Sequence, residues 1–139
     1  MSYLLDTNVV SELRKRPGRI DPNVAAWAAA LDAGDQFLSA ITVFEVELGI
    51  LQVERRDALQ GKMLRRWFDL GVLEAFAKRT LGVDREVARR AARMHVPDPR
   101  PERDMYIAAT ALVHGLTIAT RNVGDFEPTG VAVFNPWDD

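Results

Sequence analysis

Four acidic residues stand at positions from which their carboxylates could together hold a divalent cation. Asp6 directly follows a short apolar run, and Asp104 begins the apolar part of a helix that we predict over residues 101–115. Glu45 lies near the start of a long predicted helical region, and Asp125 follows a predicted strand. Because all four fall at strand ends or in first helical turns, one edge of a sheet could bring them together.

Such a cluster of carboxylates has a predictable chemistry. At a separation of about 6 Å and an effective dielectric constant near 20, each ionised pair costs on the order of 3 kcal/mol. Without a cation, some members would stay protonated, since like charges raise one another's pKa. Oxygen donors with no sulfur and no nearby histidine favour Mg²⁺ or Mn²⁺ over zinc. Ions of this kind could lower the pKa of a bound water and align it against a phosphodiester.

Each acid also has a simpler structural interpretation. Asp6 could cap the helix that follows it. Glu45 comes three residues after Thr42, which is the spacing of a capping box at a helix start. These explanations are independent of one another, whereas the positions coincide at one edge of the expected sheet. The coincidence favours a shared site.

The elements that must position these residues alternate between strand and helix along the whole chain. Apolar runs and turn residues predict strands at 3–5, 36–40, 79–83, 116–120 and 131–134. They predict helices at 7–13, 21–34, from 42 onward, 60–68 with a break at Gly71, 84–95 and 101–115. This order predicts an α/β fold: a mainly parallel central sheet with helices on both faces, in one domain over 1–139.

Composition limits the function classes that remain. The chain has 139 residues, a formal net charge of −2 and no cysteine, so thiolate metal sites, cysteine nucleophiles and disulfides are excluded. No apolar run approaches the length of a membrane span, and Asp6 interrupts the N-terminal apolar stretch, so we expect a cytoplasmic protein with neither signal peptide nor membrane contact. Basic residues form clusters, of which Arg14, Lys15 and Arg16 could hold an RNA backbone if they lie beside the acids. Otherwise such clusters are solvated helix faces.

Several segments resemble a known family, the PIN-domain ribonucleases: DTNVVSEL at the start, TVFEVELGI in the long helix, DMYIAATA in the helix over 101–115 and TRNVGDF near the end. Two further segments, NVAAW at 23–27 and the late FNPW, resemble more narrowly the VapC/FitB toxins of bacterial toxin–antitoxin pairs. The resemblance spans essentially the whole chain. It implies a PIN-like fold, RNA as the phosphodiester and a 3′-hydroxyl leaving group.

The same resemblance assigns roles to individual residues. It places the family's metal-binding and catalytic acids on Asp6, Glu45, Asp104 and Asp125. It also gives supporting roles to polar residues that could orient carboxylates or metal-bound water, namely Asn8, Thr120 and Asn122.

Partners are expected as well. The long helix carries Phe44, Leu48 and Leu51 beside its core-facing positions, and surplus apolar residues of this kind predict a homodimer. Both ends of the chain are expected to belong to the fold, which leaves no inhibitory segment to restrain a ribonuclease. We therefore expect a protein antitoxin that lies across the apolar helices and reaches the acids with an arginine.

Other functions fit less well. A haloacid-dehalogenase-type phosphatase needs a second acid two positions after the first, and that position holds Asn8. A receiver-type signalling domain needs a later lysine, yet Lys78 is the last lysine and lies outside the predicted site. The stronger alternative is a PIN-like RNA- or protein-binding module without catalytic activity.

Overall fold

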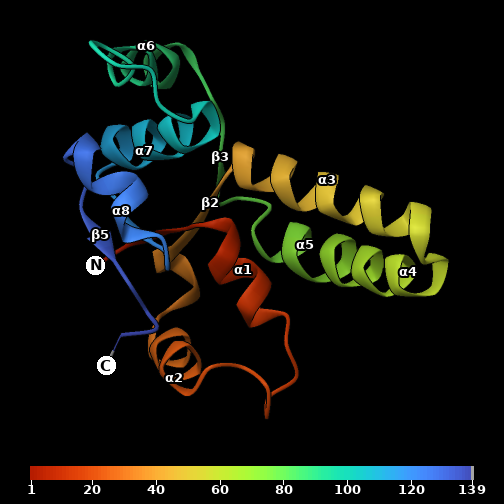
Figure 1. Ribbon diagram of the computed structural model, residues 1–139. Helices are drawn as coiled ribbons and strands as arrows, with labels where there is room; N and C mark the ends of the chain where they lie inside the picture. Colours follow the sequence, from red (N-terminus) through yellow and green to blue (C-terminus); the bar gives the residue numbers. More distant parts are fainter. Residues whose placement is uncertain (139) are drawn as a thin grey trace.

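A five-stranded parallel sheet lies at the centre of the computed structural model, which describes residues 1–138 (Figure 1). The strands lie in the order β3-β2-β1-β4-β5, and every neighbouring pair is parallel. Their bounds are Tyr3–Leu5 (β1), Gln36–Ser39 (β2), Thr80–Leu81 (β3), Thr117–Ala119 (β4) and Val133–Phe134 (β5). The α/β fold predicted from the sequence is confirmed.

Helices cover both faces of this sheet. They are Thr7–Leu13 (α1), Pro22–Ala30 (α2), Ala40–Arg56 (α3), Ala58–Arg66 (α4), Leu73–Ala75 (α5), Arg85–Arg93 (α6), Glu102–His114 (α7) and Val123–Phe126 (α8). Short 3₁₀ turns occur at Ala33–Asp35 and Glu127–Thr129, and a π-helix at Trp67–Val72. None of the helices in the described part of the chain is both long and apolar enough to cross a membrane.

Adjacent residues of β1 point to opposite faces and so divide the core in two. Leu5 packs on one side with residues of α1, α3 and the π-helix, including Val9 and Phe68. Leu4 packs on the other side with residues of α7 and α8, including Ile107 and Phe126. The alternation explains why β1 is buried along its whole length and reads as a continuous apolar run.

α3 and α4 lie side by side and form an arm that projects away from the sheet (Figure 1). A side chain at Gly61 would come within 2.7 Å of the Cα atom of Glu54, so only glycine allows the two helices to approach this closely. Arg65 of α4 binds Glu47 and Glu54 of α3 at 2.6 and 3.4 Å. The arm is therefore held together by close packing at its tip and ion pairs along its length.

The break predicted at Gly71 is wrong. The chain continues from α4 through the π-helix into α5, and the change of helical turn occurs where Phe68 is fully buried in the core. Burial of an aromatic side chain outweighs the roughly 1 kcal/mol that a glycine costs inside a helix. The predicted helix over 21–34 is too long, since α2 ends at Ala30.

Candidate active site

Asp6 lies at the carboxyl end of β1, where the chain turns into α1, and it is buried, with 7 % of its surface exposed. Its Oδ1 accepts a hydrogen bond from the backbone N–H of Thr7 at 2.8 Å, so the capping interpretation of Asp6 is correct. Its Oδ2 accepts from the hydroxyl of Thr120 at 2.7 Å and from Nδ2 of Asn8 at 3.3 Å. The carboxylate is thus held from two elements besides its own strand end. A cap alone would need only the first bond.

Burial raises the pKa of Asp6 above its usual value. The hydrogen bonds from Thr120 and Thr7 oppose this shift, while the negative charges of Glu45 and Asp125 add to it. Two other acids are therefore near enough to affect the ionisation of Asp6.

Glu45 lies in the second turn of α3, which begins two residues earlier than the sequence suggested. Ser39 caps this helix, with its hydroxyl accepting from the backbone N–H of Ile41 at 3.0 Å. The capping box proposed for Thr42 and Glu45 is therefore wrong. The hydroxyl of Thr7 instead donates to Oε1 of Glu45 at 2.7 Å.

Thr7 consequently connects two acids that are far apart in sequence. Its backbone N–H bonds Asp6 and its hydroxyl bonds Glu45. This role follows from the turn between β1 and α1, which leaves the first residue of α1 between the ends of two neighbouring strands.

Asp104 lies in the first turn of α7 and is half-buried. Burial is the main cause that raises its pKa to about 6, followed by the negative charges of Asp6, Asp125 and Glu45. Within residues 1–138 its carboxylate accepts no hydrogen bond and forms no ion pair. Asp104 therefore takes up a proton at a higher pH than an ordinary aspartate does, and a positive charge nearby would oppose this.

Asp125 does not lie at a strand end, as predicted, but in the first turn of the short helix α8. The loop after β4 uses Thr120, Arg121 and Asn122 before the helix starts. The negative charge of Asp125 nevertheless contributes to raising the pKa values of Asp6 and Asp104, so Asp125 belongs to the same group of charges.

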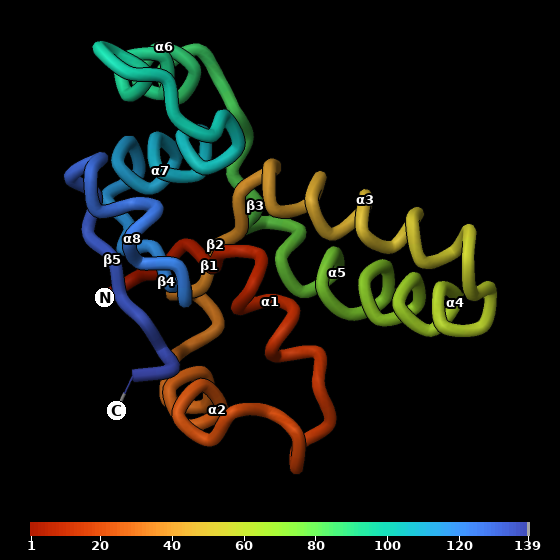
Figure 2. Tube along the Cα trace, viewed as in Figure 1, coloured from red at the N-terminus to blue at the C-terminus, as the bar shows by residue number. Residues whose placement is uncertain are grey.

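The predicted supporting residues form one hydrogen-bonded network. Thr120 donates to Asp6 and accepts from Nδ2 of Asn8 at 3.1 Å and from the backbone N–H of Asn122 at 3.0 Å. Asn8 also accepts from the backbone N–H of Arg121 at 3.2 Å. Asn122 thus enters the network through its backbone. The network ties the turn after β1 to the loop after β4, which Figure 2 shows next to each other.

The three predicted basic residues lie in different surroundings. Arg14 lines an open hollow of about 220 Å³ together with Thr7 and Glu45. Lys15 is paired with the buried Glu12 at 2.8 Å, and Arg16 lines a separate hollow. Only Arg14 therefore shares a hollow with one of the four acids.

Two charged residues of this region were not assigned roles from the sequence. Arg103 approaches Oε2 of Glu45 at 3.6 Å and lies over the ring of Phe44, at 4.9 Å from its centroid. Its position directly before Asp104 was the available signal. Glu12 accepts a hydrogen bond from the backbone N–H of Asp21 at 2.9 Å, and its pKa is lowered, mainly by Lys15. Glu12 thereby fixes the loop between α1 and α2.

The donor chemistry of the four acids suits a hard divalent cation, because every candidate ligand is a carboxylate oxygen. Their mutual effect on pKa also shows an excess of negative charge that a cation would relieve. In the described part of the chain, however, no group of three His, Cys, Asp or Glu side chains is placed to hold an ion. The residues fit the ion by type and by charge.

Comparison with known proteins agrees with this architecture. The family model for the PIN domain matches residues 3–127. Toxin FitB from Neisseria gonorrhoeae is 44 % identical over 147 aligned positions, which cover 98 % of this chain and 99 % of that protein. VapC ribonuclease Y4jK from Sinorhizobium fredii is 36 % identical, with 97 % of each chain covered. The crystal structure of FitAcB from Neisseria gonorrhoeae has a TM-score of 0.86 and 40 % identity, and covers 97 % of this chain and 98 % of that one. The chain therefore belongs to the PIN-domain family, within the group that contains Toxin FitB.

Proposed function

We propose that this chain is a metal-dependent endoribonuclease that acts in the cytoplasm as the toxin of a toxin–antitoxin pair. The observation that carries the proposal is the convergence of four carboxylates from separate elements at one edge of the sheet, where their charges act on one another. The relatives support it: one is named a toxin and another a VapC ribonuclease, and both match nearly the whole chain.

The carboxylates of Asp6, Glu45, Asp104 and Asp125 would hold Mg²⁺ or Mn²⁺. When bound, such an ion supplies an activated water and stabilises the negative charge that develops on the phosphodiester. Ion binding would also keep Asp104 ionised, since it counters the charges that raise its pKa to about 6.

Other residues of the chain orient two of the acids and place positive charge beside one of them. Thr120 and Asn8 fix the orientation of Asp6, and Thr7 fixes Glu45 relative to it. Arg103 and Arg14 place positive charge beside Glu45, where a phosphate group of RNA would need it.

The first test is RNA cleavage by the purified protein, using a mixed RNA pool with and without Mn²⁺, followed by mapping of the cut ends. We expect cleavage only with the metal, and 3′-hydroxyl ends. Activity should fall below detection in each variant that replaces an acid by its amide: Asp6→Asn, Glu45→Gln, Asp104→Asn and Asp125→Asn.

Asp32→Asn provides the matched control, because Asp32 is exposed and its side chain caps nothing. It removes one negative charge far from the site and should leave cleavage unchanged. If the wild-type protein binds Mn²⁺ but cuts no RNA, a PIN-like binding module without catalytic activity becomes the better assignment.

The proposed antitoxin would lie on the exposed apolar side chains of the α3–α4 arm. Phe44, Leu51, Leu59 and Met63 are 51, 48, 73 and 62 % exposed, far more than a core-facing helix requires. A structure of FitAB, the related protein with a second component, on a DNA fragment supports a partnered state. A cationic side chain of the partner reaching the four acids would compete with the metal.

Growth measurements test the toxin role separately from the chemistry. Expression of the chain alone should slow growth of its host, and expression of Asp6→Asn should not. A soluble, well-expressed wild-type chain that leaves growth unchanged after deletion of every candidate partner would reject the toxin assignment.

We also propose that the chain forms a homodimer through part of this apolar surface. Two of the three residues that predicted it, Phe44 and Leu51, are exposed, while Leu48 is half-buried. Light scattering at micromolar concentration should give twice the 15.5 kDa mass of one chain. The mass of one chain would contradict the proposal.

A further inference from the structure

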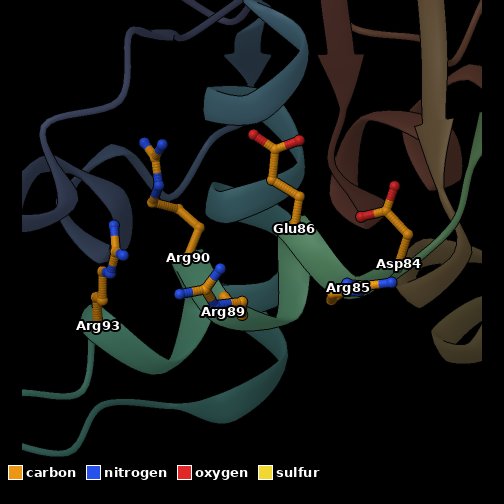
Figure 3. A pocket seen from close by; sticks show the side chains of 6 residues that line it. All are labelled: Asp84, Arg85, Glu86, Arg89, Arg90 and Arg93. Atoms are coloured by element: carbon orange, nitrogen blue, oxygen red, sulfur yellow. The ribbon is translucent and has the colours of Figure 1, made fainter.

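Helix α6 presents a row of arginines to solvent, which we name the arginine ridge and show in Figure 3. Its members are Arg85, Arg89, Arg90 and Arg93. The opposite side of the helix is fully committed to the fold, since Val87 and Ala91 are buried against Ala109 of α7. The two sides therefore differ: one packs on α7, while Arg85, Arg89 and Arg93 are exposed and Arg90 is half-buried.

The charges of the arginine ridge find no partner among the residues that the structure describes. Among residues 1–138, none of its four side chains forms an ion pair or a hydrogen bond. Arg65, by contrast, binds Glu47 and Glu54 and stabilises the α3–α4 arm. The ridge arginines line an open hollow of about 520 Å³ that also includes Asp84 and Glu86. Asp84 is occupied as the helix cap, bonded to the backbone N–H of Val87 at 2.9 Å.

The spacing of the ridge suits a chain of regularly placed negative charges. Arg85, Arg89 and Arg93 follow one another at intervals of four residues, so they repeat about every 6 Å along the helix. Guanidinium groups pair well with phosphates through two parallel hydrogen bonds. Between residues 85 and 93 no large apolar side chain is exposed. A protein interface would normally centre on such an anchor, so a polyanion fits this surface better.

The position of the ridge relates it to the four acids. The strands are parallel, so the chain leaves β3 toward α6 at the same edge of the sheet as the turn that carries Asp6. β3 is separated from β1 by β2 alone, which corresponds to roughly 10 Å across the sheet. α6 also packs along α7, whose first turn carries Asp104 (Figure 1).

We propose that the arginine ridge binds the phosphate backbone of RNA on one side of the bond that is cut. This inference rests on the proposed ribonuclease function and extends it. It assigns a second, sequence-independent contact surface to the substrate, separate from the acids. Glu86 opposes this contact, because it places a negative charge among the arginines.

The test compares two variants with the same loss of charge. The ridge variant is R85Q/R89Q/R93Q. The control variant is R55Q/R56Q/K62Q, which changes three exposed residues that form no ion pair in the described chain, at the tip of the α3–α4 arm. Binding of a fluorescently labelled single-stranded RNA of mixed sequence is measured in EDTA, so that the RNA is not cut. Circular dichroism checks that both variants fold.

We expect the salt dependence of binding to change in the ridge variant only. Loss of three phosphate contacts should reduce the slope of log K against log[salt] by about 2. Between about 50 and 200 mM salt, the wild-type protein should therefore lose roughly 15- to 20-fold more affinity than the ridge variant. Glu86→Gln should bind RNA more tightly than wild type.

Equal salt slopes for wild type and the ridge variant would overturn the inference. Equal losses of RNA affinity in the ridge and control variants would overturn it as well. If poly-glutamate binding depends on the ridge but RNA binding does not, the surface belongs to an acidic protein partner and the inference is wrong. Cleavage with Mn²⁺ is measured in parallel. If wild type cleaves RNA but the ridge variant keeps the wild-type salt slope, only this inference is wrong. If wild type cleaves no RNA but the ridge variant has a smaller salt slope, only the proposed activity is wrong.

Discussion

The two halves of the acid site differ in how firmly the protein holds them. Asp6 and Glu45 are tied by hydrogen bonds to Thr7, Asn8 and Thr120. Across residues 1–138, the carboxylates of Asp104 and Asp125 accept no such bonds. One half is thus oriented before any ligand arrives, while the other half contributes charge that the protein itself does not neutralise.

This difference suggests a division of labour. Preorganised carboxylates fix where a cation and the reacting phosphate would lie, because their positions cost no reorganisation when the ligand binds. Unpaired carboxylates favour binding of the cation, since a positive charge relieves the repulsion between them.

Among changes that leave all four acids in place, the largest effect is expected from loosening the ordered half. Thr7→Val keeps the shape of the side chain and the backbone bond to Asp6, but removes the bond to Glu45. We expect kcat/KM for RNA cleavage to fall about 10- to 100-fold, as for other residues that orient metal ligands. Thr80→Val is the control, because its hydroxyl bonds only the backbone carbonyl of Phe76 in the described structure. Equal activities of the two variants would show that the Thr7 bridge does not matter.

The unpaired half should appear in the pH dependence of stability. The pKa of Asp104 is about 6 in the folded chain, against an ordinary value of 3.8. Between these values the folded chain holds a proton that the unfolded chain has released, so this group makes the free energy of unfolding fall as pH rises from about 4 to 6. Asp104→Asn should therefore be more stable than wild type at pH 7, by on the order of 1–2 kcal/mol after allowing for solvent screening, and equally stable below about pH 4.

Urea unfolding of both proteins at several pH values measures this difference. Added Mn²⁺ should stabilise wild type at pH 7 and remove most of the advantage of Asp104→Asn. A difference in stability that does not vary with pH would show that the repulsion is absent.

The smallest effect is expected at the basic residues beside the ordered half. Arg14 shares a hollow with Glu45, whereas Arg16 lines a different one. Arg14→Gln should weaken RNA binding a few-fold and reduce the slope of log K against log[salt] by about 0.7, the value for one contact with a single strand. Arg16→Gln should change neither quantity. The reverse result would place the RNA on the other side of α1.

The sequence was most informative where local signals suffice. α1 and β1 could be predicted to the residue because an apolar run, an acid and a helical pattern follow one another directly. The membership of the four acids in one group followed from strand order and from family resemblance. Neither source indicated that only two of the four acids are held by hydrogen bonds, because the bonds from Thr7 and Thr120 join residues 38 and 114 positions apart.

Other failures have the same origin in tertiary contacts. Thr42 and Glu45 have the spacing of a capping box, but Ser39 caps α3 three residues earlier, so Glu45 lies beyond the first turn. The helix passes Gly71 because Phe68 is buried in the core. Local spacing could not reveal either the true cap of α3 or the continuation of the helix past Gly71, since both depend on what the surrounding elements bury.

The most direct test of the central claim is calorimetric titration with Mn²⁺ of the wild-type chain and the four variants in which one acid is replaced by its amide. If the acids form one metal centre, wild type should bind the ion and each variant should bind it at least tenfold more weakly. The control variant Asp32→Asn should bind Mn²⁺ as tightly as wild type. Binding by Asp104→Asn and Asp125→Asn as tight as that of wild type would contradict the claim, because the metal would then depend on the ordered half alone.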